Sequence, residues 1–357
     1  MKRIVLLFLA LSALTASAEN ASWLRYPSIS PDGNNVAFSY KGDIYIVDSE
    51  GGEARQLTSN PAYDYSPVWS PDGKTLAFAS DRYGNFDIFT IPVTGGVPFR
   101  VTTHSAKETP WTFTPDGKRL LFTARIQDPA ESAQFPKGTM TELYSVSVNG
   151  GRYEQVLATP AEEVSFIDKN GSFVYQDCKG GENIWRKHHT SSITRDIWMY
   201  DGTRHTKLTS FEGEDRSPRV SADGNTVYFM SERDGSFNIY SFPLNNPDNV
   251  SRLTSHKTHP VRFLTVSDND VLCYGYDGDI YVKRGESASK KLKITVRSDK
   301  NDDNLAELSV SGGGDNDLSA DGKQIAFISR GEVFVASTEY NTVKKITDTP
   351  EAEADVV

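Results

Sequence analysis

The sequence predicts an all-β protein: a six-bladed beta-propeller of four-stranded antiparallel blades, followed by the start of a second propeller. Two observations lead to this prediction. A motif recurs along the chain, with its clearest copy at residues 66–79, and each copy is followed by the same order of strands and turns. Repeats spaced by about 40 to 55 residues are typical of propellers or solenoids. Four antiparallel strands per repeat are typical of one propeller blade.

The second repeat shows the order of strands and turns that we expect in one blade. A strand leads into Ser70-Pro71-Asp72-Gly73, which has the residues of a tight turn because Pro presets φ, Asp bonds the local backbone and Gly tolerates positive φ. Residues 75–79 alternate between apolar and small or polar types, which favours a second strand. Residues 86–91 and 99–102 supply a third and a short fourth strand. We therefore interpret the Asp of each turn as structural; the five copies are Asp32, Asp72, Asp116, Asp223 and Asp321.

The blades are counted by their third strands. We expect these strands at residues 43–47, 87–89, 142–146, 196–200, 238–240 and 279–282. Fourth strands are expected to close at residues 56–58, 100–102, 207–209 and 252–254. A seventh unit begins at 317–327 and continues with strands at 332–335 and 344–347. It either closes one seven-bladed ring or begins a second propeller that is cut off at Val357.

Three segments follow from this count: a signal peptide at 1–18, a six-bladed propeller at 19–295, and a linker with the first blade of a truncated second propeller at 296–357. Lys2 and Arg3 precede an apolar stretch, and Ala16-Ser17-Ala18 has the small residues of a cleavage site. We expect cleavage after Ala18 and a periplasmic or secreted protein. No later stretch is apolar enough to predict a membrane span.

Net charge and cysteine content limit the classes of partner and the covalent links that we expect. The net charge is -10, which argues against nucleic acid as the main partner because phosphate binding needs concentrated Lys and Arg. The two cysteines, Cys178 and Cys273, fall in different repeats. We expect them to be buried apolar residues rather than a disulfide.

Two polar insertions interrupt the repeats, at residues 126–141 and 179–194. The second carries Arg186, Lys187, His188 and His189, which are the candidate residues for contact with a peptide or partner. A zinc site would need further ligands at workable spacing, and no motif supplies them. We find no catalytic, cofactor-binding or metal-binding constellation in the sequence, and we expect no cofactor.

Two turns carry an acidic residue followed by arginine, Asp81-Arg82 and Glu232-Arg233. We interpret them as pairs that brace neighbouring blades. The functional alternative is a ring of charges around the mouth of the central channel.

The repeat Ser-Pro-Asp-Gly-Lys-x-Leu-Ala-Phe-x-Ser-Asp-Arg, followed by Asp-Ile-Phe, resembles the propeller repeat of TolB and of the tricorn-type peptidases. A six-bladed unit is followed here by residues 306–314 and then by a fresh propeller start at 325–334. This order is similar to the junction between the first and second propellers of tricorn protease homologues.

The resemblance implies the non-catalytic propeller part of a secreted tricorn-like serine protease, which gates or guides peptides to a peptidase core absent from this chain. No catalytic residue of that family is carried over. The partners it implies are peptides or unfolded protein segments, and other copies of the chain in a homo-oligomer. The alternative is a stand-alone, TolB-like periplasmic scaffold that binds proteins. A third reading is a propeller enzyme, such as a lyase or glycosidase, with converging carboxylates or histidines.

Overall fold

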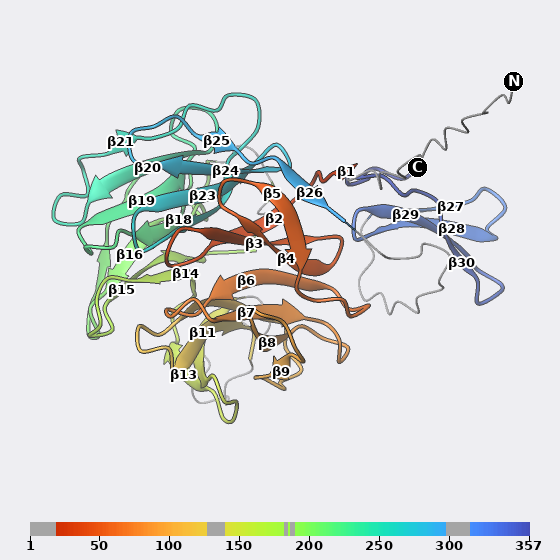
Figure 1. Ribbon diagram of the computed structural model, residues 1–357, viewed down its shortest axis with the longest axis horizontal. Helices are drawn as coiled ribbons and strands as arrows, with labels where there is room; N and C mark the ends of the chain where they lie inside the picture. Colours follow the sequence, from red (N-terminus) through yellow and green to blue (C-terminus); the bar gives the residue numbers. More distant parts are fainter. Residues whose placement is uncertain (1–18, 127–139, 182–184, 186–189, 298–314) are drawn as a thin grey trace, which may run out of the picture.

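The computed structural model describes residues 19–126, 140–181, 185, 190–297 and 315–357. Every regular element in these ranges is a strand, and the strands form seven sheets (Figure 1). Each sheet contains four consecutive antiparallel strands, and the first sheet is extended to six strands by β26 (Ile294–Val296) and β1 (Glu19–Asn20). We number the sheets one to seven in chain order. The all-β prediction is therefore confirmed for the described part of the chain.

The predicted turn joins the first two strands of sheets one, two, three, five and seven, whereas sheets four and six have other turn sequences at this position. The first strands are β2 (Arg25–Ile29), β6 (Asp64–Trp69), β10 (Glu108–Phe113), β14 (Ala161–Phe166), β18 (Asp215–Val220) and β22 (Arg262–Val266). The second strands are β3 (Asn35–Tyr40), β7 (Thr75–Ser80), β11 (Arg119–Ala124), β15 (Phe173–Asp177), β19 (Thr226–Ser231) and β23 (Val271–Tyr276).

The last two strands of each sheet run outward from the second. The third strands are β4 (Asp43–Asp48), β8 (Asp87–Pro92), β12 (Glu142–Ser147), β16 (Ile197–Tyr200), β20 (Asn238–Pro243) and β24 (Asp279–Arg284). The fourth strands are β5 (Gly52–Gln56), β9 (Phe99–Arg100), β13 (Glu154–Leu157), β17 (His205–Lys207), β21 (Ser251–Arg252) and β25 (Lys290–Lys291). Each predicted third strand coincides with a strand of the structure.

The repeated aspartates are structural, as expected. In sheet two, Asp72 Oδ1 accepts hydrogen bonds from the Ser70 hydroxyl at 2.6 Å and from the Lys74 N–H at 3.1 Å. Gly73 has a φ of 67°, which a residue with a side chain rarely adopts. The hydrogen bonds stabilise the ionised carboxylate and lower the pKa of Asp72. The same bonds recur at Asp32, Asp116, Asp223 and Asp321.

The fourth strands end earlier than predicted, and the reason is a repeated threonine. The expected segments at 56–58, 100–102, 207–209 and 252–254 each end in Thr, but the strands stop two residues or so before it. The Thr58 hydroxyl accepts the N–H of Ile44 at 2.9 Å, so a side-chain oxygen replaces the backbone ladder at the start of the third strand. Thr102, Thr209 and Thr254 do the same for Ile88, Ile197 and Ile239.

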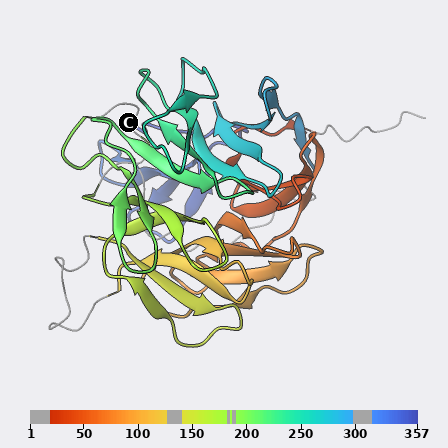
Figure 2. The same ribbon diagram turned by 90° about the vertical axis from the view of Figure 1, so that its left-hand side faces the viewer.

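The first strands of sheets one to six face a common centre. Contacts run from β2 to β6, β10, β14, β18 and β22, and then from β22 back to β2. Figure 2 shows the sheets arranged around this centre. The apolar core lies between neighbouring sheets, as where Ile44 and Ile46 of sheet one pack with Trp69 and Phe78 of sheet two.

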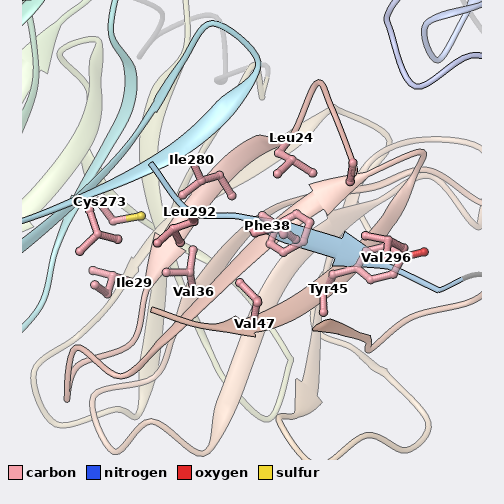
Figure 3. Packing of buried hydrophobic residues seen from close by; sticks show 14 of the residues in the cluster. Leu24, Ile29, Val36, Phe38, Tyr45, Val47, Cys273, Ile280, Leu292 and Val296 are labelled. Atoms are coloured by element: carbon pink, nitrogen blue, oxygen red, sulfur yellow. The ribbon is translucent and has the colours of Figure 1, made fainter. Parts of the chain in front are cut away.

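Sheets six and one are also joined at the periphery. After sheet six, β26 (Ile294–Val296) pairs in parallel with β5, and β1 (Glu19–Asn20) pairs with β26. Ile280 and Leu292 pack there against Phe38 and Tyr45, with Cys273 in the same cluster (Figure 3). Both cysteines are free thiols; Cys273 is buried as expected, but Cys178 is only partly buried.

The seventh sheet lies to one side of the other six (Figure 1). It consists of β27 (Asn316–Leu318), β28 (Gln324–Ser329), β29 (Glu332–Ser337) and β30 (Val343–Lys345). It contacts sheet one, where Lys41 lies 3.6 Å from Glu332, and the loop before sheet two, where Arg330 donates to the Pro61 carbonyl at 2.7 Å.

Candidate functional site

A bulge interrupts the first strand of each of sheets one to six. In five of them a residue other than glycine adopts a positive φ of 50° to 59° at the bulge; they are Tyr26, Ser66, Glu163, Ser217 and Phe263. Side chains rarely adopt this conformation, because it costs backbone energy. Because this bulge conformation recurs, the residue before it occupies a similar place in each of these sheets.

In five sheets the residue that directly precedes the bulge occupies an equivalent position, and in sheet three, where the bulge begins one residue later, Thr109 occupies it. Each pairs with the second-to-last residue of its second strand, as Tyr65 pairs with Ala79 and Arg262 with Gly275. We call this set the central ring, and its members are Arg25, Tyr65, Thr109, Glu162, Arg216 and Arg262. Neighbouring members approach each other, since the Tyr65 hydroxyl lies 3.3 Å from Thr109 Oγ1.

Charge is unevenly distributed around the central ring. Arginines come from sheets five, six and one, which are neighbours, and Glu162 comes from sheet four. The pKa of Arg262 falls to about 10, mainly because the side chain is buried and further because Arg216 and Arg25 are close. The three guanidinium groups therefore share one electrostatic environment.

A network of buried ion pairs supports the ring between sheets four and five. Arg195 Nη1 donates to Glu214 Oε1 at 3.0 Å, and both side chains are almost fully buried. Glu162 lies 3.6 Å from Arg195, and Arg216 lies 3.5 Å from Glu214. Buried charges need such partners because each loses its hydration.

Aromatic rings follow the cationic side of the central ring. Tyr26 lies between Phe263 and Tyr65, with centroid distances of 4.7 and 5.3 Å. Trp185, from the second insertion, packs against Phe263. The Arg25 and Arg262 guanidinium groups lie 5.4 and 5.1 Å from the Trp185 ring centre, and Arg262 also donates to the Trp185 carbonyl at 2.6 Å.

A cavity of about 400 Å³ lies between sheets one and two and sheet seven. Arg25, Tyr63 and Phe86 line it from sheets one and two, and Arg330 lines it from sheet seven. The pKa of Tyr63 is raised, chiefly because the phenol is buried. The cavity has a mixed aromatic and charged lining, which suits a polypeptide better than a small apolar molecule.

The candidate contact residues from the sequence, Arg186, Lys187, His188 and His189, lie outside the described residues, as do most of the first insertion and part of the second. Within the described ranges, no group of three or more His, Cys, Asp or Glu side chains is placed to hold a metal ion. No helix in the same ranges is both long and apolar enough to cross a membrane.

We predicted that Arg82 and Arg233 brace neighbouring blades, and this prediction is wrong because both arginines pair within their own sheets. Arg82 pairs with Asp64 of the first strand of its own sheet at 2.9 Å, and Arg233 pairs with Asp215 in the same way at 3.1 Å. In both sheets the buried Asp of the first strand pairs with the last residue of the second strand, and the arginine follows two residues later. Its guanidinium group therefore lies over its own sheet. The brace therefore stabilises single blades.

Sheet three has lost this brace. Glu108 of sheet three is equivalent to Asp64 of sheet two, because Glu108 pairs with Ala124 as Asp64 pairs with Ser80. Two residues further along the chain, sheet three therefore has Ile126 at the position of Arg82. Glu108 is fully buried, and its Oε1 has no hydrogen-bond partner among the described residues. Burial raises the pKa of Glu108 to about 8, with Asp87 adding to the rise while the Thr102 hydroxyl and Arg100 oppose it.

The central ring was missed by the sequence reasoning, although part of its signal is visible. In three repeats the ring residue directly precedes Tyr-Pro or Ser-Pro, as in Arg25-Tyr26-Pro27 and Arg216-Ser217-Pro218. Glu162 and Arg262 lack the proline, so only the bulges of the structure reveal that they are equivalent.

This arrangement of sheets and ring is that of a beta-propeller, and the comparisons identify which kind. The sequence profile of the tricorn protease N-terminal beta propeller domain matches residues 21–289. The chain belongs to this family.

Individual relatives agree with this assignment. The chain is 25% identical over 331 residues to the tricorn protease of Thermoplasma acidophilum, which covers 90% of this chain and 30% of that protein. It is 28% identical over 203 residues to the tricorn protease homolog of Saccharolobus solfataricus, covering 55% of this chain and 18% of that protein. The chain thus spans less than a third of the length of these relatives.

Solved structures show the same fold. A crystal structure of the tricorn protease superposes with a TM-score of 0.64 at 22% identity, covering 92% of this chain and 32% of that one. TolB from Acinetobacter baumannii superposes with a TM-score of 0.54 at 19% identity, covering 74% of this chain and 61% of that one. The resemblance inferred from the repeats is confirmed.

Proposed function

We propose that this chain is the non-catalytic propeller part of a secreted tricorn-like serine protease, and that its central ring guides peptides toward a peptidase core outside this chain. The observation that carries the proposal is the family match over residues 21–289. The central ring adds a polar, charged and aromatic lining, which can bind the backbone and side chains of an extended peptide.

We propose that sheets one to six are the blades of one propeller and that sheet seven opens a second. The direct contact of β22 with β2 supports the six-bladed ring, because it leaves no place for another blade between them. With a signal peptide at 1–18, the propeller would extend over 19–295, and residues 296–357 would contain the linker and the first blade of the next propeller.

The end of the chain repeats the geometry of a new blade. The Glu353 N–H donates to the Gly331 carbonyl at 2.9 Å, as the Asp64 N–H donates to Gly42 at 2.8 Å. Asp355 has a φ of 59°, which matches Ser66 two residues after Asp64. In sheet seven, Phe327 and Phe334 stack but remain half-buried, whereas both members of the equivalent aromatic pairs of sheets one, two, three and five are buried.

Peptide guidance is tested by equilibrium binding of a fluorescent, unstructured, neutral peptide of about ten residues to the purified chain. We expect saturable binding, together with slower hydrogen exchange in β6 and β10, which carry ring residues. Exchange in the outer strand β17 is the internal control and should not change. Absence of binding to any peptide, or protection confined to outer strands, would contradict the proposal.

The longer parent protein is tested separately. An antibody against the first propeller, used on the native cells, should detect a band far larger than the 357-residue chain. A band at the size of this chain would contradict the proposed peptidase core and favour a stand-alone scaffold, whose partner would then be sought by affinity purification.

A further inference from the structure

Two bulky aromatic residues occupy strained bulge positions on neighbouring sheets. Tyr26 of sheet one has a φ of 52°, and Phe263 of sheet six has a φ of 59°. A positive φ is unfavourable for a bulky side chain, and such strain clusters where a protein binds or acts on a ligand. The fold itself does not require aromatic residues here, because sheets two and five have Ser66 and Ser217 at the equivalent position. The two rings therefore need a reason other than the backbone geometry of a blade.

The structure leaves space for both rings beside the central ring. The Tyr26 and Phe263 ring centroids lie 4.7 Å apart across the boundary between sheets one and six, and Tyr26 also contacts Tyr65 of the central ring. Gly275 of β23 lies against Phe263, and a Cβ atom at this glycine would approach the ring to 3.1 Å. Tyr26 and Phe263 are both only half-buried, so part of each side chain remains accessible to a ligand.

The surroundings of this pair are complementary to an aromatic ligand. The Lys107 ammonium lies 5.3 and 5.2 Å from the ring centroids of Tyr65 and Phe86, and the Arg25 guanidinium interacts electrostatically with the Tyr26 phenol. Cations attract the face of an aromatic ring, and aromatic rings attract one another in tilted or edge-to-face arrangements. An aliphatic side chain gains neither interaction, and a lysine side chain is repelled by Arg25 and Lys107.

We propose that Tyr26 and Phe263 form an aromatic subsite beside the central ring, which binds the aromatic side chain of an extended peptide. The inference rests on the proposed peptide-guiding function and specifies the class of side chain that the propeller prefers. The strain at the two bulges holds the rings next to the path of the peptide, and the neighbouring cations distinguish an aromatic side chain from an aliphatic one of the same size.

The test compares three labelled peptides by fluorescence anisotropy with the whole chain. The peptides have blocked ends and the same glycine- and serine-rich sequence, and they differ in one central residue, which is phenylalanine, cyclohexylalanine or lysine. Cyclohexylalanine has the size and the apolar character of phenylalanine but no aromatic ring. We expect the phenylalanine peptide to bind about three to ten times more tightly than the cyclohexylalanine peptide, and the lysine peptide to bind most weakly.

Variants assign the preference to the two rings. Tyr26→Ser and Phe263→Ser introduce the residue that sheets two and five already have at this bulge, and each should remove most of the preference for phenylalanine over cyclohexylalanine. Tyr26→Phe should retain the preference because the ring remains. Gly275→Ala should weaken it, because the added methyl group displaces the Phe263 ring without removing it. The matched control is Tyr340→Ser, which removes an exposed tyrosine of sheet seven. Thermal unfolding checks that each variant is folded.

The outcomes separate the two proposals. Equal binding of the phenylalanine and cyclohexylalanine peptides, or tightest binding of the lysine peptide, overturns the aromatic subsite but leaves peptide guidance standing. The same conclusion follows if Tyr26→Ser and Phe263→Ser unfold at lower temperature but keep the preference, because the two rings then serve only to pack sheets six and one together. If none of the peptides binds, the proposed function fails and this inference fails with it.

Discussion

Glu108 shows how one residue change within a repeat alters the electrostatics of a blade. In sheets two and five an arginine pairs with the buried carboxylate at this position, but sheet three has Ile126 there. The carboxyl of Glu108 keeps one described partner, the Thr102 hydroxyl. The blade therefore tolerates the carboxyl best in its protonated, neutral form.

This leads to a pH dependence with a definite sign. The pKa of Glu108 rises from 4.5 to about 8 on folding, so the native state holds the proton more tightly than the unfolded state. Its contribution to stability is complete below pH 4.5 and is lost as the pH rises through about 8. At pH 9 the free energy of unfolding of Glu108→Gln should therefore exceed that of the natural chain by at least about 2 kcal/mol, because one pKa unit corresponds to about 1.4 kcal/mol. Urea unfolding measures this difference.

The control for this measurement is Glu154→Gln, since the Glu154 side chain is 71% exposed. Its urea transition should follow the natural chain at both pH 5 and pH 9. A Glu108→Gln variant that loses stability at pH 9 would show that the carboxyl is ionised and partnered in the native blade.

The residues that were predictable from sequence are those with a local cause. The turn aspartates bond to atoms within three residues, so their role is visible in the motif itself. Arg82 was assigned to the wrong partner because Asp64 lies 18 residues away and meets it only when the sheet forms. The same holds for Arg25 and Arg262, which are far apart in sequence and adjacent in the ring.

At the scale of the element, the fourth strands are short because a threonine takes over the role of the backbone. The Thr58, Thr102, Thr209 and Thr254 hydroxyls each accept an N–H at the start of a third strand. Thr347 has the same bond to Val333 in sheet seven. An aliphatic residue followed by Thr at the end of a repeat (Leu-Thr, Val-Thr or Ile-Thr) is therefore a signal of strand termination, which a pattern of alternating residues does not distinguish from a strand.

Removing one such hydroxyl should be costly. In Thr58→Val the shape is kept, but the Ile44 N–H loses its acceptor in a buried place, which costs about 1 to 3 kcal/mol. Urea unfolding measures the loss. Thr206→Val on the exposed outer strand β17 is the matched control and should change stability by less than about 0.5 kcal/mol. Equal effects of the two substitutions would contradict the capping role.

At the scale of the whole molecule, the sequence predicts the order of the sheets but not how the ring closes. The repeat count left open whether the seventh unit belongs to the same ring. The structure brings β22 against β2 and then adds β26 to the outer edge of sheet one, in parallel with β5. Such a pairing joins residues more than 200 positions apart, and no local pattern in residues 294–296 indicates its partner.

The closure should depend on the apolar side chains that β26 supplies. Ile294 is 3% exposed and packs in the cluster that joins sheets one and six. Ile294→Ala should cost about 2 to 4 kcal/mol by leaving a cavity, and should speed hydrogen exchange in β5. Val343→Ala on β30 is the control, because Val343 is 58% exposed. Unchanged exchange in β5 would show that the ring is held without β26.

The central claim is that peptides bind at the centre of the propeller, and photo-crosslinking tests it most directly. A benzophenone-bearing phenylalanine would replace Tyr65 in the central ring, and Tyr340, which is 71% exposed in sheet seven, would be replaced as the control. We predict a crosslink to a bound peptide at position 65 that unlabelled peptide competes away, and none at 340. Labelling at 340 without labelling at 65 would contradict peptide guidance through the central ring.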